Sequence, residues 1–410
     1  MLSSDTIARP LLLCGLLAAA PLAAQQVDVS LDGRLVTSDS RTSFLDGGLG
    51  KLRADANNTG VELGRLRFGM SGPLGESFHY VLDASAWSTD DTNPIDLTEA
   101  YLEWRPAPSS VWRSRVKAGA FYPAISLEHR GAGWTNKYFL NSSALNTWIG
   151  EELRTIGLEY NLDWLGAQRN SQFDFGLTAA AFGWNDPAGV VVALRGFALH
   201  DRQTPLFGRL RTWTPGGGRQ QRVLFAEVDG RPGYYVGAQA KYNDRVLVRA
   251  THYDNRADSA AFDAAIDDYA WETNFNSVGL RLQSANDWTV IAQWLSGETF
   301  VGPGRHDAWH FDTQFLLLAK QLGKHRLASR YDWFAMSQVR SIFPGLLGRD
   351  RGNAQTVSWT YEPIPRLELT AEYLQVDSNY NWRLWLGENP RARENTLQIG
   401  VRYTFQTTRR

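Results

Sequence analysis

The stretch that decides the fold is residues 156–164, Ile-Gly-Leu-Glu-Tyr-Asn-Leu-Asp-Trp, in which apolar and polar side chains alternate. Residues two apart in a β-strand lie on the same face of the sheet, so Leu158 and Leu162 share an apolar face, and Glu159 and Asp163 share a polar one. A tilted strand of about ten residues is long enough to cross a bilayer. The stretch therefore predicts a membrane-spanning strand with one lipid face and one wet face.

The same alternation returns along the rest of the chain. In residues 78–86, for example, Tyr80 and Leu82 share one face, and His79 and Asp83 share the other. Several copies of a β-sandwich would need linkers, and a β-helix would need a repeat period, but the sequence contains neither. Aromatic residues occupy the strand ends, where membrane barrels carry aromatic girdles. These residues are Trp104, Trp164, Tyr253, Trp333, Tyr361 and Phe405. The pattern predicts an all-β protein, a transmembrane antiparallel β-barrel.

Short turns and long loops alternate between the predicted strands. Membrane barrels have short periplasmic turns and longer outer loops, so this alternation indicates the topology. It predicts about sixteen strands with both termini in the periplasm. A further hairpin, formed by residues 190–199 and 223–228, would give eighteen strands as the alternative. The predicted long loops are 37–60, 88–96, 122–152, 184–232, 255–271, 297–308, 337–352 and 378–393.

Composition excludes several other classes of protein. The 410 residues include 42 Lys and Arg against 43 Asp and Glu, a formal net charge of -1. No chain-wide basic field exists to hold nucleic acid. The mean hydropathy of -0.34 is too low for a helical membrane protein, and an aromatic content of 12% is too high for a disordered one.

The first 24 residues are predicted to be a secretory signal peptide. Arg9 precedes an apolar run at 11–20, and small residues then lead to a cleavage site after Ala24. The apolar run is roughly half the length of about 20 residues that a transmembrane anchor needs. Residues 25–410 would then form one outer-membrane β-barrel. The single cysteine, Cys14, would leave with the signal peptide, so the mature chain is predicted to contain no disulfide or thiolate metal site.

Several segments, taken in order, resemble the phosphate-selective porins of Gram-negative outer membranes. The resemblance covers nearly the whole mature chain. It implies a trimeric sixteen-strand channel in which the loop after the fifth strand folds inward and constricts the pore. The segments are 64–69 (GRLRFG), 97–104 (LTEAYLEW), 116–123 (VKAGAFYP), 153–158 (LRTIGL), 242–250 (YNDRVLVRA) and 402–405 (RYTF).

Two features depart from that family. The last strand is expected to end on an aromatic residue, but residues 406–410 follow Phe405. Lysines are also few, so a lysine-rich phosphate site does not carry over from the family to this chain.

Basic residues on the wet faces of the strands are the candidate selectivity groups. Arginine keeps its charge and grips oxyanions with two parallel donors, so rows of arginine in a lumen suit phosphate or carboxylate solutes. The alternative is that these residues pair with inward-facing carboxylates and create only a transverse field that orients polar solutes. The predicted pore-lining and anion-binding residues are Arg65, Arg67, Arg113, Arg115, Lys117, Arg130, Lys137, Arg154, Arg249 and Arg330.

Residues 122–152 are the candidate constriction loop. A loop of this length usually packs inside a barrel or performs a function. Its aromatic residues would anchor it to the wall or offer a solute a flat surface, and its charges would face the opening. An outer loop packed on a neighbouring subunit is the alternative. The residues concerned are Glu128, His129, Arg130, Trp134, Lys137, Tyr138, Phe139 and Trp148.

These observations predict an outer-membrane porin that admits small hydrophilic solutes by passive diffusion, with a bias towards anions such as phosphate. The expected partners are such solutes, outer-membrane lipid and lipopolysaccharide, and two further copies of the chain. Enzyme motifs such as a Gly-x-Ser-x-Gly elbow or a Walker loop are absent, so we expect no catalysis, cofactor or metal. The alternatives are a channel for uncharged solutes such as sugars, and a plugged barrel that is a structural protein or a hydrolase.

Overall fold

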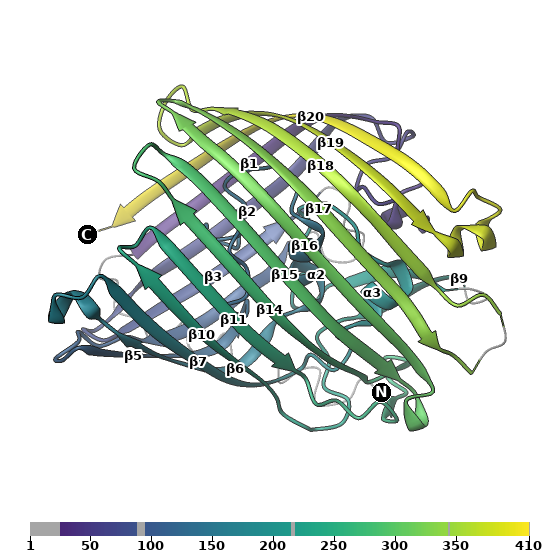
Figure 1. Ribbon diagram of the computed structural model, residues 1–410, viewed down its shortest axis with the longest axis horizontal. Helices are drawn as coiled ribbons and strands as arrows, with labels where there is room; N and C mark the ends of the chain where they lie inside the picture. Colours follow the sequence, from purple (N-terminus) through teal and green to yellow (C-terminus); the bar gives the residue numbers. More distant parts are fainter. Residues whose placement is uncertain (1–24, 88–94, 215–217, 343–344, 410) are drawn as a thin grey trace.

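The computed structural model describes residues 25–87, 95–214, 218–342 and 345–409. The predicted signal peptide, residues 1–24, and most of the predicted loop 88–96 lie outside the described residues. Within the described ranges, sixteen antiparallel strands form a closed barrel (Figure 1). The strands are β1 (Gln25–Ser38), β2 (Gly60–Leu74), β3 (Phe78–Ala86), β4 (Asp96–Trp104), β5 (Trp112–Phe121), β6 (Thr155–Trp164), β7 (Phe173–Gly183), β10 (Gly233–Tyr242), β11 (Val246–Asp254), β14 (Trp271–Gln283), β15 (Trp288–Val301), β16 (Asp307–Leu322), β17 (His325–Arg340), β18 (Arg349–Tyr361), β19 (Leu367–Tyr380) and β20 (Arg391–Arg409).

The barrel closes between its first and last strands. β1 pairs with β20 from Gln25 opposite Arg409 to Ser38 opposite Thr396. Residues 406–409 therefore continue β20 beyond Phe405 and complete this seam. The short turns lie at one end of the barrel and the long loops at the other (Figure 1).

The prediction of sixteen strands is confirmed, and the eighteen-strand alternative is wrong. Residues 190–195 form the helix α3 (Val190–Arg195) in place of a strand. The hairpin of β8 (Arg209–Thr214) and β9 (Gly218–Val223) is a separate two-stranded sheet that is not part of the barrel wall. The apolar run at the start of α3 is buried inside the barrel, so its hydrophobicity reflects an internal helix and not a strand facing lipid.

The loop predicted at 297–308 is shorter in the structure. β15 continues to Val301 and β16 begins at Asp307, because the two strands remain paired as far as that point. The turn between them contains Gly302 and Gly304, both with positive φ, a conformation that glycine adopts without a steric penalty. Polar residues on both strands near the turn interrupt the apolar–polar alternation. The sequence pattern therefore did not indicate that β15 and β16 stay paired up to the turn.

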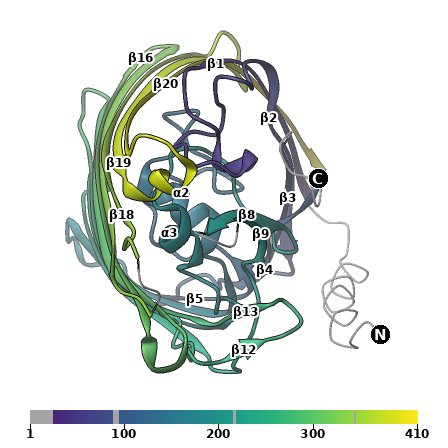
Figure 2. The same ribbon diagram turned by 90° about the vertical axis from the view of Figure 1, so that its right-hand side faces the viewer.

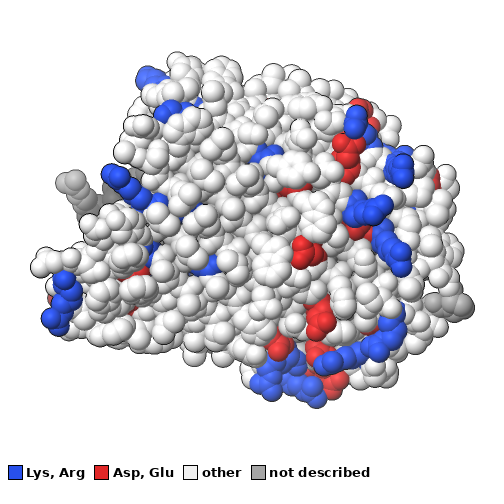
Figure 3. All heavy atoms as spheres, in the orientation of Figure 1, with Lys and Arg blue, Asp and Glu red and all other residues white. Residues whose placement is uncertain are grey.

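The alternation of apolar and polar residues correctly predicts which side chains face outwards and which face the lumen. On β6, Leu158 is 58% exposed on the outside, whereas the neighbouring Glu159 is 1% exposed and faces the lumen. On β17, Leu327 is exposed and Arg326 is buried inside the barrel. Over the face visible in Figure 3, charged side chains gather towards the end with the long loops and along the lower edge, and much of the remaining surface is uncharged.

Arginine placed on the outer face should destabilise the barrel. We expect Leu158→Arg or Leu327→Arg to cost about 2 to 4 kcal/mol near mid-depth, because a charge is then transferred into hydrocarbon. Exchange for another apolar residue should cost little. Reversible folding into lipid vesicles measures the difference. Equal tolerance of arginine at Leu158 and at Glu159 would contradict this assignment of faces.

Residues 39–59 fold into the barrel from the end with the long loops, where Leu52 pairs with Leu199 and Lys51 contacts Asp350 of β18 at 2.6 Å. Two longer segments fold into the barrel from the same end. The first, residues 122–154, contains α2 (Ala144–Glu152), and the second, residues 184–232, contains α3 and the β8–β9 hairpin. Figure 2 shows both helices and the hairpin within the ring of strands. The inward fold of the first segment was predicted; that of the second was not. None of the helices among the described residues is long and apolar enough to span a membrane.

The two segments share a buried apolar cluster inside the lumen. Trp148 and Ile149 of α2 are 1% and 0% exposed, and Val190 to Ala193 of α3 are fully buried. Wall residues such as Phe275 and Phe311 pack against Trp148 with ring centroids 5.3 and 5.0 Å away. We call this assembly, residues 144–153 and 190–199 with the wall side chains that contact them, the apolar plug.

A buried carboxylate joins the two halves of the apolar plug. Glu152, at the end of α2, accepts hydrogen bonds from the backbone N–H groups of Gly189 (3.1 Å) and Val191 (2.8 Å) at the start of α3. The indole of Trp148 donates to the same carboxylate. Burial raises the pKa of Glu152 to about 7, although the hydrogen bonds oppose the shift.

Candidate pore constriction

The segment from Tyr122 to Arg154, the constriction loop, crosses the lumen between β5 and β6. It turns back on itself at an isolated antiparallel bridge between His129 and Asn136 and then enters α2. Ser143 caps α2, with its hydroxyl oxygen accepting the backbone N–H of Asn146. The tip of the loop, residues 130–137, is thereby held out in the lumen.

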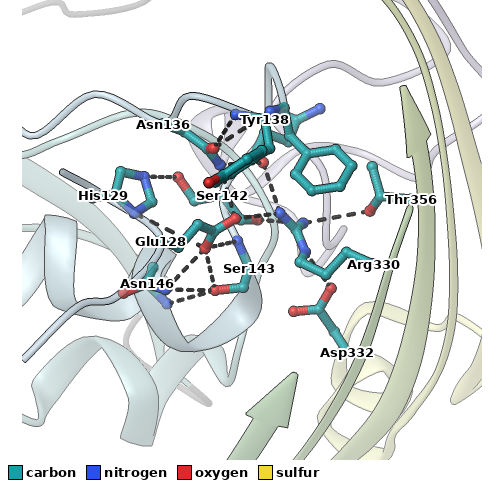
Figure 4. A network of polar contacts seen from close by, with 12 residues as sticks. Glu128, His129, Asn136, Tyr138, Ser142, Ser143, Asn146, Arg330, Asp332 and Thr356 are labelled. Atoms are coloured by element: carbon teal, nitrogen blue, oxygen red, sulfur yellow. Dashed lines mark hydrogen bonds and ion pairs between the residues drawn. The ribbon is translucent and has the colours of Figure 1, made fainter. Parts of the chain in front are cut away.

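A buried ionic network fixes the constriction loop to the wall (Figure 4). The guanidinium of Arg330 on β17 donates to Glu128 of the loop at 2.6 Å and to Asp332 at 2.7 Å, and all three side chains are 0% exposed. Glu128 also accepts the hydroxyl of Ser143 at 2.7 Å and the side-chain amide of Asn136 at 2.8 Å. Burial opposes ionisation of Glu128, but Arg330 outweighs burial and holds the pKa of this carboxyl below its usual value.

The neighbouring strands reinforce this attachment. Arg330 donates to the carbonyl oxygens of Asn141 (3.0 Å) and Ser142 (2.9 Å). Glu372 on β19 accepts the backbone N–H of Leu140 at 2.5 Å and the side-chain amide of Asn141 at 2.7 Å. The middle of the loop is therefore held by two wall strands. Arg330 was predicted to line the pore; the structure places it under the loop as an anchor.

A stack of flat side chains forms the other support of the loop. Trp134 lies between Tyr122 (ring centroids 4.4 Å apart) and His129 (3.9 Å). The guanidinium carbon of Arg154 lies 3.5 Å from the ring centroid of Tyr122. Arg154 is fully buried and donates to the carbonyl of Thr204 at 2.9 Å, so it joins the two inward segments. It too acts as a support in the structure and not as an exposed anion ligand.

Acid should loosen the constriction loop through His129. Burial, together with the positive charges of Arg330 and Arg65, lowers the pKa of His129 to about 4 from its usual 6.5, despite the favourable charge of Glu128. The unfolded loop therefore binds a proton that the folded loop does not, so stability falls as pH falls from about 6.5 towards 4. We expect single-channel current noise to rise over that window. His129→Asn, which retains a polar contact to Ser142, should flatten this part of the pH profile; an unchanged profile would exclude His129 as its source.

The predicted basic row on β5 faces the lumen opposite carboxylates on β6. Arg113 and Arg115 both contact Asp163, at 3.0 and 3.1 Å, and Lys117 contacts Glu159 at 3.2 Å. The side chains of the two arginines are 37% and 30% exposed, so the row borders water on the lumen side. Asp163 and Glu159 therefore neutralise part of the positive charge of this row.

Two exposed basic residues lie at the tip of the loop. Arg130 and Lys137 are exposed, and neither makes an ion pair with any residue in the described part of the chain. The charges of Arg130 and Arg115 both act on Arg249 of β11, which donates to the carbonyl of Ala124 at 2.9 Å. Arg115, Arg130 and Arg249 are thus close enough to repel one another, two of them on the wall and one at the loop tip.

Arg65 and Arg67 lie on the opposite side of the loop, on β2. Arg67 contacts Asp83 at 2.5 Å, and Arg65 donates to Ser85 at 2.9 Å and to the carbonyl of Gly133 at 2.9 Å. The loop tip is therefore held by Arg65 from the wall. Beside it lies a small cavity of about 30 Å³ between the loop, the wall and the second inward segment. Its charged lining residues are Asp32, Arg65, Asp201 and Arg402, with His129.

Asp32 and Asp201 were not predicted to be site residues, whereas Arg402 was expected among the lumen-facing arginines. Asp32 and Arg402 lie on the first and last strands, and their 3.0 Å contact depends on closure of the barrel. Asp201 lies in the second inward segment. The path of that segment inside the barrel cannot be predicted from the alternation of residues along the strands. The apolar run at 190–194 was the available signal, because such a run in an outer loop needs somewhere to be buried.

One group of carboxylates within the described residues has the spacing of metal ligands. Oxygens of Asp186, Glu227 and Asp229 all lie within 4.8 Å of one another. Burial raises the pKa of Asp186 to about 7, and the backbone N–H of Val228 donates to it at 2.5 Å. A backbone N–H group thus already donates a hydrogen bond to Asp186 of this cluster.

Comparison with known proteins supports the fold. No family model and no curated protein matches the sequence. Among solved structures, the chain is similar to the outer membrane channel DcaP of Acinetobacter baumannii (TM-score 0.53, 11% identity, 94% of this chain and 99% of that chain). It is also similar to the anion-selective porin from Comamonas acidovorans (TM-score 0.51, 10% identity, 93% and 100%). In-vitro folded OmpT of Vibrio cholerae in its trimer form gives a TM-score of 0.53 at 12% identity, over 93% and 99%.

The chain thus has a barrel fold similar to that of these outer-membrane proteins. A closed barrel with an apolar outer face belongs in the outer membrane.

Proposed function

We propose that the protein is an outer-membrane porin through which small hydrophilic solutes diffuse passively, with a bias towards anions such as phosphate. The observation that carries the proposal is the exposed pair Arg130 and Lys137 at the tip of a loop inside the lumen. Fixed positive charge at the edge of a narrow opening attracts anions and repels cations. Arg249 and Arg115 add to this charge from the wall.

The proposal includes the maturation and assembly expected from the sequence. Residues 1–24 are removed as a signal peptide, and residues 25–410 form the barrel. Three copies assemble in the outer membrane of a Gram-negative bacterium, with lipid and lipopolysaccharide around them. The trimer rests on the resemblance to porins, and one structural neighbour is described as a trimer.

A channel for sugars is less well supported. Stacking of sugars requires open aromatic faces, but both faces of Trp134 are covered, by Tyr122 and by His129. The face of Phe139 lies 4.7 Å from the guanidinium of Arg330. The aromatic residues of the loop therefore serve packing within the protein.

A barrel that stays plugged is the second candidate, and the apolar plug favours it. Recording from planar bilayers under a KCl gradient tests both. We expect ohmic channels whose reversal potential lies on the anion side. Ohmic channels with cation preference would contradict the anion bias, and insertion without current would establish the plugged barrel.

A further inference from the structure

Towards the long loops, the outer face of β18, β19 and β20 becomes basic. Asp350 and Glu394 on these strands are 1% and 0% exposed and face the interior of the barrel. Their neighbours Arg351 and Arg393 therefore point outwards, and both are exposed. The constriction loop and the apolar plug lie on the other side of the wall, so this surface is separate from the lumen.

The strand register arranges the outward side chains of these three strands in rows. Each row lies two residues further towards the long loops than the one before. The first row is apolar and aromatic, the second consists of amides, the third contains an ion pair, and the fourth has two arginines beside an amide. The rows are Val357, Tyr373 and Leu397; Gln355, Gln375 and Asn395; Asn353, Asp377 and Arg393; and Arg351, Asn379 and Arg391.

This order of rows follows the polarity of one membrane leaflet. Tyr373 belongs to the first row, and its hydroxyl donates to Asn395 of the second row at 2.8 Å. Aromatic side chains with a polar end are favoured where hydrocarbon gives way to headgroups. Strands tilted by about 45° place the third and fourth rows roughly 10 to 14 Å beyond the first. Because long loops face outwards in membrane barrels, the arginines lie at the level of the outer-leaflet headgroups.

The positive charges of this surface outnumber its carboxylates. Arg349, Arg351 and Arg391 are exposed, and none of them makes an ion pair with a residue in the described ranges. Arg393 contacts Asp377 at 2.8 Å, and their side chains are 66% and 39% exposed. We call these four arginines the basic face. Figure 3 shows Lys and Arg gathered at the right-hand end of the molecule, where Figure 1 places the long-loop ends of these strands.

The neighbouring part of the wall is acidic at the same end. Glu272, Glu298 and Asp312 point outwards from β14, β15 and β16. Arg305 donates to Glu272 at 2.7 Å, and His310 lies 3.6 Å from Glu298. An anionic headgroup is thus attracted to β18–β20 and opposed on β14–β16.

The chemistry of the rows matches a phosphorylated lipid. A guanidinium group without a carboxylate partner offers a phosphate two parallel donors. Adjacent strands are about 4.8 Å apart, so Arg351 and Arg391, two strands apart, can hold separate phosphates roughly 10 Å from each other. The amides of the second row can bond to hydroxyl and carbonyl groups below the phosphates. A free anion in solution would gain nothing from the amide and apolar rows.

We propose that the basic face binds an outer-leaflet lipid whose sugar headgroup carries more than one phosphate. The acyl chains pack on the first row, and the phosphates bind Arg349, Arg351 and Arg391. This inference goes beyond the proposed porin function, because it concerns the outer surface. It rests on the position of the barrel in the outer membrane and not on conduction through the lumen.

Binding of a phosphorylated glycolipid to the whole barrel tests the proposal. The barrel is refolded into detergent micelles without bacterial lipid, and the probe is hexa-acylated lipid A with two phosphates. The same lipid after enzymatic removal of both phosphates is the comparison. We expect the triple variant Arg349→Gln, Arg351→Gln, Arg391→Gln to bind the phosphorylated lipid at least roughly tenfold more weakly, and the dephosphorylated lipid as the wild type does.

A matched control removes three exposed arginines from the same end of the barrel, beside the acidic wall. Arg231, Arg256 and Arg305 are exposed there, and Arg231 and Arg305 contact Asp258 and Glu272. Their replacement by glutamine should leave the affinity for the phosphorylated lipid within about twofold, because exposed charges away from the site are screened. Equal losses in the two triple variants, or equal affinity of the wild type for both lipids, would overturn the proposal.

Two further measurements separate other occupants of the basic face. Millimolar inorganic phosphate should not displace the lipid; displacement would overturn the proposal in favour of a free anion. A changed oligomeric state of the basic-face variant with unaltered lipid affinity would assign the face to a contact between copies of the chain and overturn it too. Conductance is recorded in parallel. A barrel that conducts without binding the phosphorylated lipid would refute this inference alone, and one that binds the lipid without conducting would refute only the porin function.

Discussion

Replacing Arg130 and Lys137 by glutamine should lower the anion-to-cation permeability ratio by roughly tenfold. These residues carry exposed basic charge at the tip of the constriction loop, and neither has an ionic partner among the residues described. Removing two unit charges a few ångströms from a passing ion changes its energy by on the order of 1 to 2 kcal/mol at an intermediate dielectric constant. Reversal potentials in planar bilayers measure the ratio directly.

A matched control removes the same charge elsewhere. Arg169 and Arg245 are exposed on short turns at the far end of the barrel, and their replacement by glutamine should leave the ratio within about twofold, because salt screens charges in open water. Neutralising Arg113 and Arg115 should have an intermediate effect, since both already contact Asp163. If the loop-tip variant and the turn variant gave equal ratios, the anion bias would not originate at the constriction.

Strand parity and turn lengths were enough to predict the barrel wall. The side-chain period of two is local, so Glu159 and Arg326 were assigned to the lumen from their immediate neighbours. The short turns between paired strands gave the strand count. The same local signal placed Arg65 and Arg67 inside, where the structure has them.

The partners of these charges were beyond local reasoning. Asp32 and Arg402 lie 370 residues apart in sequence, and only closure of the barrel brings them together. Arg330 was assigned to the lumen correctly by parity, but its role as an anchor depends on where Glu128 lies in a long loop. Loop paths follow from tertiary packing, which no periodicity encodes. For that reason the apolar plug, including α3, was also missed.

Arg330 is the residue whose loss should change the constriction most. Arg330→Gln leaves Glu128 and Asp332 buried without their cation, and breaking a buried ion pair in this way costs about 3 to 5 kcal/mol. The wall strands retain their backbone pairing, so the loss falls on the attachment of the constriction loop. We expect the barrel to fold, and single-channel conductance to rise with large fluctuations as the loop leaves the wall.

Arg326→Gln is the control for this experiment, because Arg326 lies four residues away on the same face of β17. Its partner Glu368 is 3.4 Å away and 27% exposed, so water can replace the contact, and we expect a conductance close to that of the wild type. A triple variant, Glu128→Gln with Arg330→Met and Asp332→Asn, removes all three charges of the buried network. Its single-channel current should fluctuate less than that of Arg330→Gln alone, since no buried charge is then left without a partner. If Arg330→Gln left conductance and noise unaltered, the loop would be held by Glu372 and the aromatic stack alone.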